Sequence, residues 1–268
     1  MIPRKIHYCW FGRGQKPELA ERCIQSWHEF CSDYEFCEWN EENFDIESAP
    51  LYVRQAYAAK KWAFVTDYVR LYVLYHYGGI YMDTDVEVLK PLDPFLSYEA
   101  ISGFESNETV PTGLMGCRKG QHLFREFLNE YDEAVFLKEN GEYDLTTNVV
   151  RITNACKKHG LVLNNTKQTI EGFTLFPSEF FCPKDYRTGD LHMTEHTYAI
   201  HYFAGSWIPE EQRKAFITLQ KYERFFGEKD GELIYQAVKA LKEEGLASLI
   251  GRIKRHYEKQ NSRKQENK

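Results

Sequence analysis

The stretch 78-GGIYMDTDVEVL-89 combines two glycines, a short apolar run and the sequence Asp83-Thr84-Asp85. Two carboxylates one residue apart at the end of a buried strand repel each other unless a cation or several hydrogen-bond donors offset the repulsion. Carboxylate oxygens bind hard divalent cations, and such a cation can bridge the oxygens of a diphosphate. An Asp-x-Asp can also be a plain solvated turn. The Gly-Gly, the apolar segment before it and the acidic Glu87 after it favour a site for Mn²⁺ or Mg²⁺.

The segment before this stretch is predicted to be a buried helix. From about residue 62 to residue 77 the side chains are apolar nearly all round, and Gly78 follows as a stop signal. Asp67 and Arg70 lie three apart on this helix and are therefore neighbours on one face. They can form a structural ion pair, bind a ligand, or do both.

The N-terminal part of the chain has the pattern of a β-α-β unit. Residues 5–11 favour a strand, a helix is predicted after Pro17, and residues 34–39 favour a second strand. This order is typical of nucleotide-binding α/β folds. Further strands are predicted at 80–86, 100–105, 113–117, 161–164, 168–177 and 197–207, and further helices at 51–60, 121–138 and 145–160. In the strand 80–86, Tyr81, Asp83 and Asp85 would share one face.

The composition indicates a folded protein without a nucleic-acid partner. Of the 268 residues, 43% are hydrophobic and 15% are aromatic, which allows a well-packed core. The net charge of -6 argues against nucleic-acid binding, which needs a basic surface. The seven cysteines include no C-x-x-C pair and are expected to be buried thiols in a reducing compartment. Because neither a leader nor a membrane-spanning run is recognised, we expect a cytoplasmic protein.

Four segments carry a resemblance to a known family. The run 62-WAFVTDYVRLYVLYHYGGIYMDTDVEVLKPLD-93 resembles the sugar-binding D-x-D region of family-32 glycosyltransferases, a group that includes bacterial capsular-polysaccharide enzymes and yeast mannosyltransferases. The opening 2-IPRKIHYCWFG-12, followed by 26-SWHEFCSDYEFCEWNEENFD-45, resembles the family's first β-α-β unit, and 200-IHYFAGSW-207 resembles its closing metal-site segment. Residues 106–195 match no family pattern position by position, and acceptor specificity is expected to lie there.

The resemblance implies an α/β fold of the GT-A type: a single Rossmann-like nucleotide-sugar-binding domain with a C-terminal helical extension. It implies that Asp83, Asp85 and His201 hold Mn²⁺ or Mg²⁺, with Asp83 also reaching the ribose or the donor sugar. It further implies that Asp67, Arg70 and Tyr81 bind the donor sugar. A strand histidine such as His201 is more often a core residue, and only its place before 203-FAGSW-207 favours a ligand.

The resemblance also implies residues at the nucleotide and at the leaving group. The nucleotide-binding set is His7, Trp10, Phe11, Asp83, Ser206 and Trp207. The catalytic set is Asp83, Asp85 and Trp207, with Ser206 and Trp207 donating hydrogen bonds to the departing diphosphate. Trp10, Phe11 and Trp207 can equally be packing residues, and no nucleophile or base is assigned.

The C-terminal part is helical and becomes basic. We expect a catalytic domain at 1–230 and an amphipathic, basic helical tail at 231–268, because the last 18 residues hold seven Lys or Arg against two Glu. Residues 241–268 could lie on an anionic membrane surface, which would place the protein at the inner face of the plasma membrane. The alternative is a surface helix with a disordered end.

The expected function is a retaining, metal-dependent glycosyltransferase that moves a hexose from a nucleotide sugar to a glycan or lipid-linked acceptor in surface-polysaccharide biosynthesis. UDP-glucose or UDP-galactose is the first candidate donor. The alternatives are a GDP-mannose-dependent mannosyltransferase, a metal-dependent nucleotide-sugar phosphohydrolase, and a non-catalytic nucleotide-sugar-binding protein. A phosphohydrolase with two metals would need more clustered acids or histidines than one D-x-D and one distant histidine supply.

Overall fold

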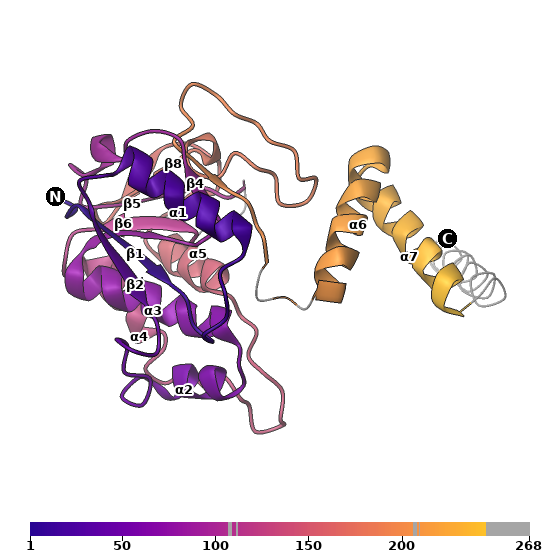
Figure 1. The fold of residues 1–268 in the computed structure, drawn as a ribbon, viewed down its shortest axis with the longest axis horizontal. Helices are drawn as coiled ribbons and strands as arrows, with labels where there is room; N and C mark the ends of the chain where they lie inside the picture. Colours follow the sequence, from indigo (N-terminus) through magenta and orange to yellow (C-terminus); the bar gives the residue numbers. More distant parts are fainter. Residues whose placement is uncertain (107–108, 111, 206–207, 209, 245–268) are drawn as a thin grey trace, which may run out of the picture. The chain divides into compact units, whose positions relative to one another are not determined.

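The computed structural model describes the chain except for residues 107–108, 111, 206–207, 209 and 245–268 (Figure 1). The helices are α1 Glu18–Phe30, α2 Leu51–Ala58, α3 Trp62–Tyr77, α4 His122–Asn129, α5 Asn148–Lys158, α6 Glu210–Phe226 and α7 Glu228–Glu244. The strands are β1 Lys5–Cys9, β2 Glu35–Trp39, β3 Gly79–Met82, β4 Val86–Val88, β5 Ala100–Gly103, β6 Leu114–Cys117, β7 Gln168–Ile170, β8 Phe173–Phe176 and β9 Ala199–His201. Two short 3₁₀ turns, Asp93–Phe95 and Ser178–Phe180, complete the described elements.

Seven of the strands form one mixed sheet in the order β2-β1-β3-β6-β5-β8-β7. Strands β2, β1 and β3 are parallel, as the predicted β-α-β unit requires, and β6 runs antiparallel to both β3 and β5. The carboxyl ends of β1 and β3 therefore lie at the same edge of the sheet, where ligands of open α/β sheets bind. This architecture confirms the α/β, GT-A-type fold expected from the sequence.

The two faces of the sheet carry separate hydrophobic clusters. Helices α2 to α5 pack on one face and α1 packs on the other (Figure 1). Tyr81 of β3 belongs to the cluster on the first face, and Trp27 belongs with Ile80 and Met82 to the cluster on the second. Alternation along β3 sends Tyr81 toward α3 and its neighbours toward α1. Because Asp83 has the same parity as Tyr81, its carboxylate points toward α3 as well.

The junction between α3 and β3 depends on the two glycines of the opening stretch. Gly78 and Gly79 have φ angles of 69° and 116°, which residues with a Cβ rarely adopt. A Cβ on Gly78 would also lie 2.7 Å from the backbone nitrogen of Lys119. The predicted helix stop is confirmed, and it turns the chain directly from the buried helix into the central strand.

The strand predicted at 80–86 is wrong in its second half. Strand β3 ends at Met82, and Asp83, Thr84 and Asp85 form a turn in which the Val86 N–H donates to the Asp83 carbonyl at 2.9 Å. The chain then leaves the large sheet, because β4 pairs with β9 instead. Helix α1 holds β4 in place through Trp27, whose Nε1–H donates to the Val86 carbonyl at 2.7 Å.

Other predicted elements also differ from the structure. The strand predicted at 168–177 is two antiparallel strands, β7 and β8, and the described residues of the strand predicted at 197–207 form only β9. Residues 161–164 form no strand, and the helix predicted at 121–138 ends at Asn129. The long segment after α4 instead carries an isolated bridge between Leu137 and Tyr143.

The chain divides into two compact units. The first comprises Met1–Asp185 and Asp190–Trp207, and the second comprises Tyr186–Gly189 and Ile208–Lys268. In the second unit, α6 and α7 are joined at Gly227 and approach closely at Gly231, where a Cβ would lie 2.5 Å from the Glu223 Cα. Among the described residues, no helix is both long and apolar enough to span a bilayer. The functional boundary at residue 230 stays a prediction.

Candidate metal and sugar-binding site

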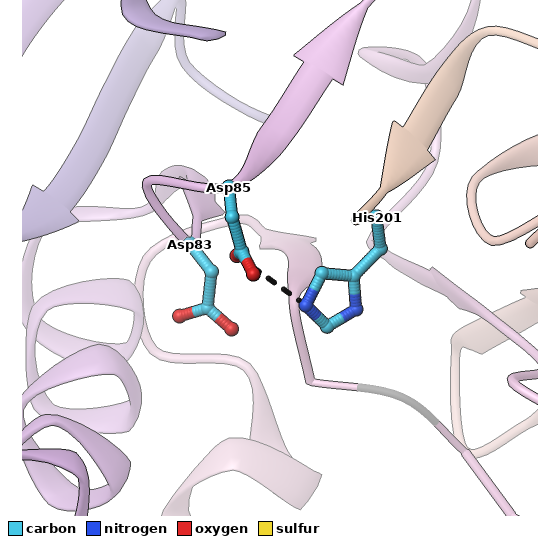
Figure 2. A group of neighbouring side chains, drawn as sticks. All are labelled: Asp83, Asp85 and His201. Atoms are coloured by element: carbon cyan, nitrogen blue, oxygen red, sulfur yellow. Dashed lines mark ion pairs between the residues drawn. The ribbon is translucent and has the colours of Figure 1, made fainter. Parts of the chain in front are cut away.

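Three predicted metal ligands meet at one point of the first unit. Asp83 and Asp85 come from the turn between β3 and β4, and His201 ends β9 (Figure 2). Pairing of β4 with β9 sets Val86 opposite His201, so Asp85 and His201 become neighbours although they lie 116 positions apart in the chain. One ligand atom from each of the three residues lies within 4.8 Å of the others. The structure thus brings together the whole predicted metal set.

Asp85 and His201 face each other. The Nε2 of His201 lies 3.4 Å from Oδ1 of Asp85, and Oδ2 of Asp85 accepts a hydrogen bond of 2.7 Å from the Ala204 N–H. Burial alone would raise the pKa of Asp85, but His201 and the Ala204 N–H outweigh burial and hold it below its usual value. For His201 burial works in the opposite direction, and the Asp85 carboxylate raises its pKa well above the usual value.

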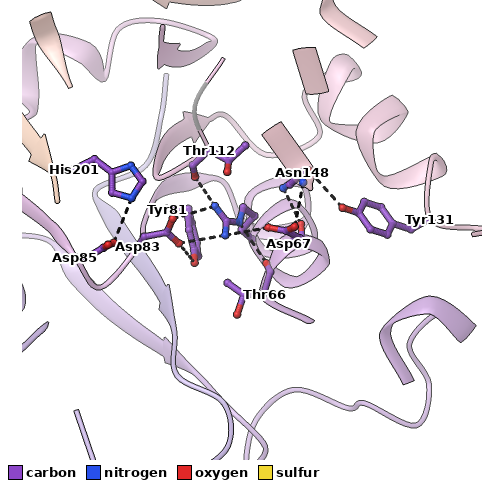
Figure 3. Close-up of polar contacts among 10 residues, drawn as sticks. Thr66, Asp67, Tyr81, Asp83, Asp85, Thr112, Tyr131, Asn148 and His201 are labelled. Carbon is purple, nitrogen blue, oxygen red and sulfur yellow. Dashed lines mark hydrogen bonds and ion pairs between the residues drawn. The ribbon is translucent and has the colours of Figure 1, made fainter. Parts of the chain in front are cut away.

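Asp83 is bound on both of its carboxylate oxygens. Its Oδ1 accepts from the Tyr81 hydroxyl at 2.8 Å and lies 3.2 Å from Nη2 of Arg70, while its Oδ2 accepts from Nη1 of Arg70 at 3.3 Å (Figure 3). The predicted role of Tyr81 is to line the sugar pocket. The structure buries its ring, leaving 1% exposed, and directs its hydroxyl to Asp83.

Arg70 is the centre of the polar network. Its guanidinium contacts Asp67 at 3.2 Å, Asp83, and the Thr112 carbonyl at 2.7 Å, and it lies over the Tyr81 ring. Burial alone would lower the pKa of Arg70, but Asp83 and the other surrounding anionic groups outweigh burial and raise it. The i,i+3 ion pair with Asp67 is confirmed, and Arg70 extends it to the D-x-D.

Asp67 has a second partner, which the sequence did not reveal. The N–H of Asn148 donates to its Oδ2 at 3.1 Å, and the Asn148 side-chain amide donates to its main-chain carbonyl at 3.0 Å. Burial raises the pKa of Asp67 to about 6 against the opposing effects of Arg70 and Asn148. Asn148 begins α5, 81 positions from Asp67, and the only sequence signal is its polar surroundings before a helix. Nothing in the sequence around Thr112 indicates that its carbonyl accepts a hydrogen bond from Arg70.

The predicted nucleotide-binding residues occupy different environments. His7 is 1% exposed, with Nε2 at 2.8 Å from the Gly78 carbonyl and Nδ1 accepting from the Trp39 indole at 3.1 Å. Both ring nitrogens are therefore used within the protein. Phe11 is buried and packs edge-on against Phe44.

Trp10 is partly buried, at the carboxyl end of β1, and its indole donates to the Gly14 carbonyl at 2.6 Å. It is the most accessible of the three predicted nucleotide contacts. Ser206 and Trp207 lie outside the described residues. The nucleotide-binding roles of these five residues and of Asp83 stay predictions.

The ligand types in this site suit a divalent cation. Two carboxylates and an imidazole make up the donor set, and the imidazole can bind a metal ion in its neutral form. Oxygen ligands favour Mg²⁺ and Mn²⁺, and the imidazole favours Mn²⁺ over Mg²⁺. Oδ1 of Asp85 and Nε2 of His201 face each other at 3.4 Å, whereas the oxygens of Asp83 already accept from Arg70 and Tyr81.

Comparisons with known proteins agree with this site. Residues 17–102 match the family model described as a glycosyltransferase sugar-binding region containing a DXD motif. The chain is 33% identical over 138 residues to inositol phosphoceramide mannosyltransferase 3 of Schizosaccharomyces pombe, which covers 50% of this chain and 38% of that protein. It is 27% identical over 143 residues to mannosyl phosphorylinositol ceramide synthase SUR1 of Saccharomyces cerevisiae, covering 51% of this chain and 37% of that protein. The chain spans less than two fifths of the length of either relative.

Solved glycosyltransferase structures are similar at low identity. The galactosyltransferase LgtC with donor and acceptor sugar analogues has 15% identity and a TM-score of 0.44, covering 81% of this chain and 95% of that one. The PaToxG glycosyltransferase has 17% identity and a TM-score of 0.43, covering 59% of this chain and 69% of that one. The sequence match to a glycosyltransferase sugar-binding region containing a DXD motif covers residues 17–102, and it includes Asp67, Arg70 and both aspartates of the candidate metal site.

Proposed function

We propose that the protein is a metal-dependent glycosyltransferase that moves a hexose from a nucleotide sugar to a glycan or lipid-linked acceptor, with retention of the anomeric configuration. One observation carries the proposal: Asp83, Asp85 and His201 place ligand atoms within 4.8 Å of one another, and both aspartates lie in the matched DXD region. The Arg70 network beside them supplies buried polar groups of the kind that fix sugar hydroxyls.

Asp85 and His201 would hold the cation directly, and Asp83 would face both the cation and the donor. When bound, the cation acts as a Lewis acid that offsets the charge developing on a departing diphosphate. Arg70 and Tyr81 keep the Asp83 carboxylate in one orientation, and the Ala204 N–H does the same for Asp85. Asp67, held by Arg70 and Asn148, would accept hydrogen bonds from the donor sugar. Ser206 and Trp207 remain the proposed donors to the leaving group.

GDP-mannose is the donor we propose first. The names of both relatives specify the transfer of mannose, and residues 17–102 of this chain match the sugar-binding family model. UDP-glucose and UDP-galactose are the second candidates, as expected from the capsular-polysaccharide resemblance. Mannose and glucose differ in the orientation of one hydroxyl. A donor pocket can distinguish the two sugars when one of them leaves a buried polar group of the pocket without its hydrogen bond.

A lipid-linked acceptor at the cytoplasmic face of the membrane is proposed on separate grounds. The relatives' names specify ceramide-linked acceptors, and the last 18 residues of this chain carry seven Lys or Arg. In the second unit, Phe225 is 82% exposed, and Leu233 and Leu241 of α7 are also exposed. Apolar side chains with nearby basic residues favour an anionic lipid surface. Co-sedimentation of the full chain with phosphatidylserine vesicles, but not with phosphatidylcholine vesicles, is the expected result.

A donor panel tests the central proposal. Thermal unfolding of the full chain is followed with GDP-mannose, UDP-glucose and UDP-galactose, each with Mn²⁺ and with EDTA. Selective binding raises apparent stability by RT ln(1 + [L]/Kd). We expect a shift with one nucleotide class, only with Mn²⁺, that disappears in Asp85→Asn. Asp132→Asn makes the same chemical change at an exposed residue outside the site and should keep the shift.

Analysis of the reaction products distinguishes a glycosyltransferase from a phosphohydrolase and from a non-catalytic binding protein. A transferase releases the nucleoside diphosphate and forms a new glycoside when an acceptor is present. A phosphohydrolase would release a sugar phosphate instead, and a binding protein would shift in melting temperature without any turnover. The absence of a shift with every donor in Mn²⁺ would refute the proposed site.

A further inference from the structure

Gly113, immediately before β6, lies against two of the three predicted metal ligands, Asp83 and His201. Its carbonyl accepts the Asp83 N–H at 2.8 Å, which fixes the start of the D-x-D turn. Its Cα side faces the His201 ring: a Cβ at this position would lie 2.8 Å from Nδ1, 2.9 Å from Cε1 and 3.2 Å from Cγ. Contacts below 3.0 Å are too close for a real Cβ, so the position is open to glycine alone unless the ring moves.

The reason for glycine here is space and not backbone conformation. The positive-φ glycines of the chain do not include Gly113, so alanine is allowed at its φ angle. The His201 ring has little room to yield, because it also lies against Phe203, with ring centroids 4.2 Å apart, and faces Asp85. An added methyl group would therefore change the position of the imidazole relative to the Asp85 carboxylate.

We propose that Gly113 is a positioning residue for the metal site: its missing side chain sets the separation of His201 from Asp85, and thereby the affinity for the cation. The inference rests on the proposed function, because it assumes that His201 is a ligand. Residues behind metal ligands commonly change metal affinity by 10- to 100-fold when they are altered.

The test is Gly113→Ala in the full chain, with Mn²⁺ affinity measured by titration calorimetry. We expect the Kd for Mn²⁺ to rise at least about 10-fold. The Mn²⁺ concentration for half-maximal activity should rise in parallel, with kcat largely recovered at saturating Mn²⁺. Gly116→Ala is the matched control. It lies in β6, and its Cβ would also be crowded, although less than at Gly113, with the Ile101 side chain at 3.1 Å. It should lower the melting temperature but leave the Kd for Mn²⁺ unchanged.

A double-mutant cycle distinguishes a role of Gly113 in positioning His201 from a general destabilisation of the fold. Measured in EDTA, the melting temperature should fall by several degrees on Gly113→Ala in the wild type and by much less in His201→Ala, because the clashing ring is gone. An equal fall in both backgrounds, or an unchanged Kd for Mn²⁺ in Gly113→Ala, would overturn the proposal. Failure of the wild type itself to bind Mn²⁺ would instead refute the proposed function.

Discussion

The two halves of the candidate site are built differently. On the α3 side, Asp67 and Asp83 share one buried arginine, and the oxygens of both carboxylates are bound within the protein. On the β9 side, Asp85 and His201 face each other at 3.4 Å, and only Oδ2 of Asp85 accepts a short backbone hydrogen bond. The α3 half is held by several contacts within the protein, whereas Asp85 and His201 form an ion pair with each other. The two aspartates of the turn are therefore fixed by different partners: Asp83 by Arg70 and Tyr81, and Asp85 by His201 and the Ala204 N–H.

Replacing Arg70 by methionine should have the largest effect. The change removes the guanidinium that pairs with the carboxylates of Asp67 and Asp83. Removing one partner of a buried charge pair costs about 3–5 kcal/mol of unfolding free energy. Urea unfolding measures the loss. Arg118→Met, which breaks an exposed pair with Glu99, should cost at most about 1 kcal/mol. Equal losses in the two variants would mean that the Arg70 network does not hold the α3 half together.

Asp85→Asn should leave the fold intact and remove the activity. The amide keeps the shape of the carboxylate but loses the charge that faces His201 and the cation. Losing metal-dependent charge stabilisation of several kcal/mol corresponds to a fall in kcat/KM of about 10³-fold. Initial rates at saturating Mn²⁺ test this expectation. A variant with near wild-type rates would remove Asp85 from the metal site.

Tyr81→Phe should have an intermediate effect on activity. The ring remains beneath Arg70, but Oδ1 of Asp83 loses a hydrogen bond of 2.8 Å. A hydrogen bond to a charged acceptor is worth about 1.5–3 kcal/mol, so kcat/KM should fall by about 10- to 150-fold. Tyr34→Phe is the control, since the Tyr34 hydroxyl has no hydrogen-bond partner among the described residues. A similar loss in both variants would argue against a role for the Asp83 contact.

The smallest effect is expected for His7→Gln, which should change how the free energy of unfolding depends on pH. Burial, assisted by Lys5, lowers the pKa of His7 below its usual value of about 6.5, and the Trp39 indole donates to its Nδ1. The unfolded chain therefore binds a proton at a higher pH than the folded one, and the folded state loses stability as pH falls below about 6.5. His7→Gln should flatten this part of the stability-pH curve, measured by urea unfolding from pH 7 to pH 5. An unchanged slope would show that His7 does not titrate on unfolding.

The features of the site that depend on residues close together in the chain could be predicted from the sequence. The helix stop at Gly78, the first half of the central strand and the i,i+3 pair depend on neighbours within a few residues, and these were predicted correctly. The family pattern also placed His201 with the D-x-D, which no local signal could have done.

The remaining contacts depend on tertiary pairing. Asn148 and Thr112 reach Asp67 and Arg70 across 81 and 42 positions, and nothing in their own sequence context marks them as partners. The predicted strand through Asp85 failed because Val86 pairs with His201 and not with the central sheet. That departure from the local strand pattern is what turns two neighbouring aspartates toward different partners.

The central claim is that Asp83, Asp85 and His201 hold one divalent cation. Titration calorimetry of Mn²⁺ into the full chain, in the presence of GDP, tests the claim most directly. The account predicts one Mn²⁺ per chain for the wild type and for Asp132→Asn, with binding lost in Asp85→Asn and weakened in His201→Ala. Equal Mn²⁺ binding by the wild type and Asp85→Asn, or no binding by either, would contradict it.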